Sequence, residues 1–313
     1  HKSSHSFPTR RSSDLEGTWP SVIGQAYCRQ PGIATPEQVA AWRRVTDAVH
    51  ANGGLIVLQL MHAGRIGSRH VKPPGIETVA PSAIRAAGEV FTDAAGLQPF
   101  DEPRALSTAE VQAVVREHAA AADNARAAGF DGVELHGTSG YLPMQFLCSG
   151  TNHRSDDYGG STPKRARFMV ACLAAMADAI GSARVGLRLN PGNTYNDTQD
   201  DDPAASHAEL MRQAAGLGLA YLHVMRAPTP AIDAFALARE HFGGRLILND
   251  GFDAANAEQA LADGAGDAVS FARHYIGNPD LVRRFREGLP LARFDRKTLY
   301  TPGPRGYSDY PPA

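Results

Sequence analysis

The chain has 313 residues, of which 43% are hydrophobic, so it can bury a large core as one large domain or two ordinary ones. Its formal net charge is −2 and no long basic block follows the first dozen residues, which argues against nucleic acid or an anionic membrane as the main partner. The three cysteines, Cys28, Cys148 and Cys172, lack metal-type spacing and indicate free thiols in a reducing compartment.

The first segment, residues 1–15, differs in composition from the rest of the chain. It is rich in Ser, Arg and His and has no apolar periodicity. We interpret it as disordered or foreign to the fold, for example a tag or a gene-model fault. Residues 16–313 are then expected to form a single domain.

From residue 16 onward, short β-rich apolar runs alternate with Ala-rich amphipathic segments. The apolar runs predict parallel strands buried on both faces. These runs are Leu55–Leu60, Gly132–His136, Val185–Leu189, Leu219–Val224, Arg245–Leu248 and Asp267–Phe271.

Helix starts are marked between these runs. Thr35 and Ser107 each begin a capping box, and Asp202 and Asn278 each precede a proline at a first helical position. Gly264 suits the end of a helix that starts near Asp253.

Strand and helix alternation of this kind predicts parallel strands joined by right-handed crossovers. A closed barrel and an open doubly wound sheet both satisfy that rule. No GxGxxG follows an early strand, and the number of repeats favours a (β/α)₈ TIM barrel. The connection 61–106 is too long for a crossover, so we expect it to form a lid or insertion over one barrel mouth.

Polar side chains follow several predicted strands, where barrel chemistry is expected. Arg188 at a strand end is costly to bury without an anionic partner. A turn at Gly251 after the run Arg245–Leu248, and Arg273 after the run Asp267–Phe271, fit the phosphate site that follows the last two strands of many barrels. His136 and Tyr141 can donate hydrogen bonds or protons. The residues alone therefore predict a phosphorylated cofactor beside a His/Tyr pair.

A series of specific motifs runs through the chain in a fixed order. They are EGTW at Glu16–Trp19, PGIATPEQVAAWRRVTDAVHANGG at Pro31–Gly54, LQLMHAGR at Leu58–Arg65, APSAI at Ala80–Ile84, PRALSTAEV at Pro103–Val111, AGFDGVELHGTSGYLPMQFL at Ala128–Leu147, TNHRSDDYGGS at Thr151–Ser161, RLNP at Arg188–Pro191, GLAYLHV at Gly218–Val224, NDGF at Asn249–Phe252, RHYIGNPDL at Arg273–Leu281 and TLYTPGPRGYSDYP at Thr298–Pro311. Through these motifs the sequence resembles the old yellow enzyme family over nearly everything after residue 15.

The resemblance implies an FMN-dependent oxidoreductase in which NADPH or NADH reduces FMN and then leaves. An electrophilic alkene or nitro compound would take its place. Gly17 and Gln59 would contact the flavin ring system. Arg188 would lie at the N1/C2=O edge, where positive charge stabilises the anionic reduced flavin. Tyr300 would close over the flavin from the C-terminal segment.

The phosphate of FMN would be held by the turn that contains Asn249 and Gly251, together with Ala272 and Arg273. Ala272 departs from the family, which commonly has Gly before the phosphate arginine. The backbone is therefore expected to approach the phosphate more tightly here.

Carried over to the substrate side, the resemblance makes His136 the donor to the activating carbonyl or nitro group. Tyr141 would deliver the proton to the opposite carbon. Ser139 stands where the family has Asn or His, and a hydroxyl reaches less far than an amide or imidazole. Met61 replaces a frequent Trp and is expected to reshape the substrate pocket.

The resemblance also predicts that the barrel is truncated at its N-terminus. The first strand, the first helix and most of the second strand are expected to be missing, with Leu15–Trp19 as the end of the second strand. Phe7–Arg10 echoes the end of the family's first strand, but five residues before Glu16 are too few for a helix and a strand. FMN binding and activity are then expected to be impaired.

Two other functions stay open at this point. One is a non-catalytic barrel remnant that binds flavin or phosphate without turnover. The other is a metal-assisted hydrolase using His62 and His136, although no carboxylate motif accompanies them and we assign no metal. Arg188 or Arg273 alone equally fits a structural ion pair. The partner is expected to be a small molecule, the chain a monomer or homo-oligomer, and its location the cytoplasm, because no leader or membrane span is visible.

Overall fold

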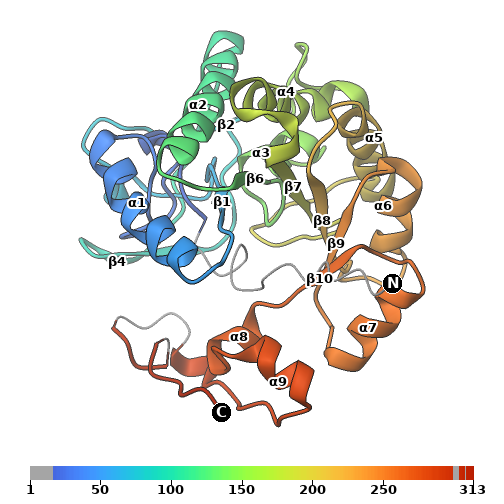
Figure 1. Cartoon of the computed structure of the whole chain (residues 1–313). Helices are drawn as coiled ribbons and strands as arrows, with labels where there is room; N and C mark the ends of the chain where they lie inside the picture. The colour runs from blue at the N-terminus through green and yellow to red at the C-terminus, as the bar shows by residue number, and fades with distance from the viewer. Residues whose placement is uncertain (1–16, 299–302, 307) are drawn as a thin grey trace.

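The computed structural model describes residues 17–298, 303–306 and 308–313. Its centre is a parallel sheet of six strands whose spatial order, β1-β6-β7-β8-β9-β10, follows the chain, with helices packed around its outer side (Figure 1). The strands are β1 Val57–Leu60, β6 Gly132–His136, β7 Val185–Leu189, β8 Tyr221–Met225, β9 Leu246–Asn249 and β10 Ala268–Ser270. All six predicted strands are confirmed, each to within two residues at either end.

The helices that surround the sheet in Figure 1 lie before β1 or between one strand of the sheet and the next. They are α1 Pro36–Ala51, α2 Thr108–Ala127, α4 Thr162–Ile180, α5 Pro203–Ala215, α6 Ala234–Phe242 and α7 Ala254–Ala262. Shorter helical pieces are α3 Leu142–Leu147, α8 Arg273–Gly277, α9 Leu281–Glu287, η1 Val22–Gly24, η2 Arg69–Val71, η3 Ser182–Arg184 and η4 Arg296–Thr298. None of the described helices is long and apolar enough to cross a lipid bilayer.

Three of the four helix starts predicted from capping residues are present in the structure. Thr35 and Ser107 both form the expected capping boxes, and the Asp202 side chain caps α5. The expectation for Asn278 is wrong, because α9 begins at Leu281 after Asp280. Asn278 instead ends α8, and its side-chain amide donates to the carbonyls of His274 and Ala292. The Asn-Pro pair therefore marks the end of α8 and not the start of α9, because the Asn278 side chain bonds to a distant carbonyl.

Strand β6 is buried on both faces, as the sequence predicts, but its two faces differ in polarity. Val133 and Leu135 of β6 pack outward in the main hydrophobic core. Glu134 and His136, which alternate with them, are buried on the inner side of the sheet. Successive strand residues point to opposite faces, so the inner face of the barrel carries polar side chains and the outer face carries the apolar ones.

The long connection 61–106 forms two small sheets. Strands β3 Glu89–Thr92 and β4 Gly96–Pro99 pair in an antiparallel hairpin, and β2 Val79–Ala80 pairs in parallel with β5 Arg104–Ala105. The buried Arg65 ties the start of this segment to the rest of the chain by donating to the backbone carbonyls of Ile84 and Asn196.

The two edges of the sheet are unequal. On the β1 side, Thr18 forms a parallel bridge with Leu60, in agreement with the expected end of a strand there. On the other side, within the described residues, no strand pairs with the outer edge of β10, and the side chains of β10 are only half-buried. Residues 1–15 and Tyr300 lie outside the described residues.

Candidate functional site

The carboxyl ends of the six parallel strands meet at one mouth of the barrel, and several predicted site residues lie there. The strand register sets Gln59 beside Glu134, and His136 beside Arg188 on the next strand. Asn249 lies beside Ser270 in the same way. The sheet therefore brings together residues that are far apart in the sequence.

Arg188 is held by a network of buried polar groups. Its guanidinium donates to the side-chain oxygen of Asn249 at 2.9 Å, and it lies 3.0 Å from the Nε2 atom of His223. His223 Nδ1 lies 2.9 Å from the Glu134 carboxylate, which also accepts a hydrogen bond from Gln59 at 2.7 Å. The predicted need for an anionic partner is met by Glu134, which acts through space and through His223.

The charges in this network follow from burial. Burial and the neighbouring Arg188 lower the pKa of His223, so its imidazole is neutral. Burial opposes ionisation of Glu134, but His223, Arg188 and Gln59 together lower the pKa of its carboxyl. Burial also lowers the pKa of Arg188, although not enough to remove its proton near neutral pH. The network is therefore a Glu134–Arg188 charge pair bridged by neutral donors and acceptors.

His136 ends β6 and carries an unused hydrogen-bonding atom. Its side chain is buried, and its Nδ1 atom has no partner in the structure. Burial, with a further contribution from Arg188, lowers its pKa to about 3, so the imidazole is neutral near pH 7. A buried polar atom without a partner costs about 1–3 kcal/mol, so this Nδ1 atom is available to bond a ligand at the mouth.

Tyr141 lies beside His136 at the start of α3, with ring centroids 5.2 Å apart. Its hydroxyl shares a 2.8 Å hydrogen bond with the hydroxyl of Tyr27. Burial raises the pKa of Tyr141, so the phenol keeps its proton and can act as a donor. Tyr27 belongs to the segment before α1 and was not predicted as a site residue.

Ser139 lies in the turn between β6 and α3 and has a φ of 59°, a left-handed conformation that non-glycine residues seldom adopt. Gly140 follows with a φ of 74°, where an added Cβ would lie 2.5 Å from the Tyr195 carbonyl oxygen. The turn is fixed by the side chain of Asn196, which donates to the Ser139 carbonyl at 2.8 Å. Ser139 is thus placed by a tight backbone turn, next to His136 and Tyr141.

Gly17 and Met61 pack against each other at the β1 side of the mouth. An added Cβ on Gly17 would lie 2.6 Å from the Met61 sulfur, so no larger residue fits at position 17 without movement. Met61 itself is buried. The structure therefore places the predicted flavin contact beside the predicted substrate-pocket residue.

The turn after β9 has an unusual backbone. Asp250 and Gly251 both have positive φ, 74° and 77°, so two successive residues are left-handed. Arg273, at the first position of α8, is largely exposed and donates to the Asp250 carboxylate at 2.8 Å. Ala272 is the N-cap of α8. The predicted phosphate residues therefore lie together, with the arginine partly neutralised by an aspartate.

The two histidines considered for a metal do not come together with other ligands. His62 lies against the imidazole of His118, with ring centroids 6.3 Å apart, and its Nδ1 atom accepts a hydrogen bond from the backbone of Gly64. In the parts of the chain that the structure describes, no three His, Cys, Asp or Glu side chains are grouped as metal ligands.

Sequence reasoning missed Glu134, His223, Ser270 and Tyr27. The first three occupy alternate, inward-facing positions of their strands, and His223 Nε2 lies 2.7 Å from the Ser270 hydroxyl. The signal was present in the sequence only in part, as polar residues at alternate positions of some strand runs, such as Glu134 and His136 or Tyr221 and His223. Tyr27 gave no such signal, because its partner Tyr141 is 114 residues away.

Known proteins resemble this chain in sequence and in fold. The sequence profile of the NADH:flavin oxidoreductase / NADH oxidase family matches residues 15–292. This chain belongs to that family. The old yellow enzyme family expected from the motifs is therefore confirmed, and the protein is an NAD(P)H-dependent flavin oxidoreductase that uses FMN.

Relatives of the family match nearly the whole chain. A probable flavin mononucleotide-dependent alkene reductase of Leishmania infantum is 43% identical, over 91% of this chain and 80% of its own length. Morphinone reductase in complex with tetrahydroNAD superposes with a TM-score of 0.91 at 42% identity, covering 95% of this chain and 83% of that one. The old yellow enzyme from Trypanosoma cruzi gives a TM-score of 0.91 at 34% identity, with 95% and 84% covered. These structures establish the TIM-barrel fold.

The residues at the mouth fit FMN. Arg188 offers the buried cation that a negatively charged ring edge requires. The left-handed turn at Asp250–Gly251 presents backbone near Arg273, as an anion-binding turn does. The unpaired Nδ1 atom of His136 leaves a polar contact at the mouth unused.

Proposed function

We propose that this protein is an ene-reductase, which uses NAD(P)H and FMN to reduce activated C=C bonds in enones, nitroalkenes and related electrophiles. The observation that carries this proposal is the pairing of a buried, neutral, unpartnered His136 with a protonated Tyr141 at the mouth where Arg188 lies. Such a pair can polarise an acceptor group and supply one proton in the same site.

Bound at this mouth, FMN would supply the hydride chemistry that links NAD(P)H to one carbon of the alkene. His136 donates a hydrogen bond to the carbonyl or nitro oxygen of the substrate, where negative charge develops. Tyr141 gives its proton to the other carbon, and Tyr27 is placed to hold the resulting phenolate by a hydrogen bond. Arg188 stabilises the negative charge of the reduced ring edge. Ser139 supplies at most a short second donor, and Met61 shapes the pocket.

We assign the cofactor contacts in the same way. Gly17, Gln59 and Arg188 contact the ring system. The phosphate is held by the turn of Asn249 and Gly251 and by the start of α8 at Ala272 and Arg273.

The domain that holds these contacts runs over residues 16–313. The segment 61–106, with its two small sheets, forms a lid over the mouth.

The 313-residue chain is proposed to hold FMN weakly and to be impaired in turnover. What supports this is the outer edge of β10, whose backbone groups have no strand partner among the described residues. Unpaired edge groups favour association, and each costs about 1–3 kcal/mol where water is excluded. Gel filtration with a visible spectrum tests the proposal: a monomer that keeps one FMN per chain through the column would contradict it.

The deciding experiment for the function supplies excess FMN to the purified chain under anaerobic conditions. Oxidation of NADPH or NADH should depend on an added enone or nitroalkene and should be lost in His136→Ala. A chain that binds FMN without any alkene-dependent oxidation would instead support the alternative, a flavin- or phosphate-binding barrel without turnover. If the chain binds no flavin at all, both assignments fail.

A further inference from the structure

Arg226 follows β8 directly and lies at the turn assigned to the FMN phosphate. Its Nε atom is 3.4 Å from the Asp250 carbonyl oxygen, and an added Cβ on Gly251 would lie 3.2 Å from the same atom. The sequence motifs included Gly251 and Arg273 but did not include Arg226. The structure therefore places a second arginine against the left-handed turn.

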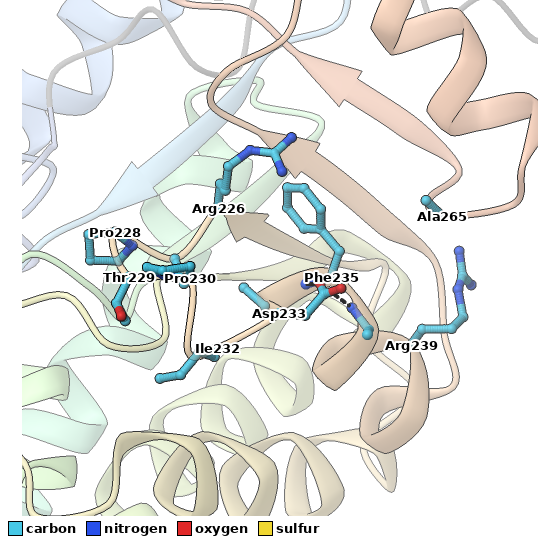
Figure 2. A pocket seen from close by; sticks show the side chains of 12 residues that line it. Arg226, Pro228, Thr229, Pro230, Ile232, Asp233, Phe235, Arg239 and Ala265 are labelled. Carbon is cyan, nitrogen blue, oxygen red and sulfur yellow. Dashed lines mark hydrogen bonds between the residues drawn. The ribbon is translucent and has the colours of Figure 1, made fainter.

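Two aromatic rings hold the Arg226 guanidinium in place. Its central carbon lies 4.9 Å from the ring centre of Phe235 and 5.2 Å from that of Phe252. Figure 2 shows the Arg226 and Phe235 side chains directed toward one another at one end of a cavity of about 680 Å³. The two rings are stacked on each other with centres 5.8 Å apart, so both lie to one side of the guanidinium. Among the described residues only its Nε–H bonds to the protein, so its terminal N–H groups stay available for an anion.

The charges around the turn make a further cation necessary. Asp250 and Arg273 form an ion pair, so together they contribute no net charge. A phosphate monoester carries close to two negative charges at neutral pH and would also meet the Asp250 carboxylate. In the described part of the chain, Arg226 forms no ion pair with a carboxylate, and its charge is uncompensated.

We propose that Arg226 is a phosphate-binding residue of this protein and shares the phosphate of FMN with the Gly251 turn. The guanidinium is pre-ordered by Phe235 and Phe252, so little side-chain entropy is lost when the phosphate binds. This inference rests on the proposed use of FMN at this mouth. It assigns the contact to the phosphate and not to the ring system.

A comparison of two flavins isolates that contact, because riboflavin differs from FMN only by lacking the phosphate. We would titrate each flavin with the 313-residue chain and follow the quenching of flavin fluorescence. Arg226→Met should weaken FMN binding by about tenfold or more, the usual effect of losing a charge-assisted hydrogen bond to phosphate. Riboflavin binding should stay the same, and Arg226→Lys should restore part of the FMN affinity.

The matched control is Arg239→Met, at the other end of the same cavity. Arg239 donates to the Gly264 carbonyl at 3.0 Å and should alter neither dissociation constant. An unchanged FMN constant in Arg226→Met, or an equal loss for FMN and riboflavin, would overturn the assignment. An FMN-selective loss without alkene turnover would support Arg226 and contradict the proposed function. If the unaltered chain binds neither flavin, both fail.

Discussion

Replacing Ser139 by Asn should speed alkene reduction. Ser139 has a φ of 59°, and Asn is among the residues that adopt this conformation most readily. The substitution therefore adds no backbone strain. The Asn amide extends one bond farther than the Ser hydroxyl and can donate to the oxygen that His136 already contacts in the proposed site.

The size of the effect follows from one added hydrogen bond to a developing oxyanion. Such a bond contributes roughly 1.5–3 kcal/mol when it is well placed. Since about 1.4 kcal/mol corresponds to a factor of ten, the rate should rise about ten- to hundredfold. Ser139 is only half-buried, so the larger side chain has room. The geometry of Gly140 and Asn196, which fixes the turn, is left unchanged.

The assay isolates the second half-reaction. The chain with excess FMN is reduced by dithionite, mixed anaerobically with an enone, and followed by the return of flavin absorbance. Ser139→Gly is the control, because it accepts the same φ but brings no donor, and it should not be faster than the unaltered chain. An Asn variant that binds FMN normally and reoxidises no faster than the Gly variant would refute two-point activation at this position.

Three more predictions use other parts of the site and core. Arg188→Met combined with Glu134→Gln removes both buried charges together and should lower the flavin midpoint potential; an unchanged potential with FMN bound would rule out the assigned role. Tyr141→Phe should slow reoxidation by a 2-enone while dithionite-reduced FMN forms as before, and equal reoxidation rates would show that the proton comes from elsewhere. His118 has a folded pKa of about 4, below 6.5 in the unfolded chain, because it is buried. The unfolded state then binds more protons, so the free energy of unfolding should fall by about 3 kcal/mol as the pH drops from above 6.5 to about 4. His118→Gln should flatten this slope in urea titrations at several pH values, and an identical slope would count against the prediction.

Local chemistry explains why the sequence predicts the strands and most caps. The capping box at Ser107, for instance, depends on Glu110 three residues away, and both hydrogen bonds form within one turn. The expectation for Asn278 fails because the amide bonds to Ala292, fourteen residues farther along the chain. A local signal is decisive only when no distant partner competes for the same side chain.

The same local reasoning could not predict which polar side chains pair on the inner face of the barrel. Glu134 belongs to one of the family motifs, but its partner His223 is 89 residues away. No local sequence feature of either residue predicts this pairing. The run Gly132–His136 is buried on both faces, as predicted, but its alternate positions Glu134 and His136 place polar side chains on the inner face. Only the register of β6, β7 and β8 brings these side chains together.

Arg188 and Arg226 have different neighbours, and the difference matches the two ends of FMN, the ring system and the phosphate. Arg188 has a buried carboxylate, Glu134, as its counter-charge, so its positive field at the mouth is partly balanced. A flavin ring is neutral when oxidised and gains negative charge only on reduction, so a balanced cation favours the reduced form without holding the oxidised ring by charge. Arg226 rests on Phe235 and Phe252, which fix its position without neutralising it. A phosphate is anionic in every step, and an unbalanced cation gives constant attraction there. If Arg226 had a carboxylate partner, it would attract the phosphate less. If Arg188 had none, it would bind the anionic reduced ring too tightly. Arg226 therefore serves cofactor binding, whereas Arg188 serves the reactivity of the ring.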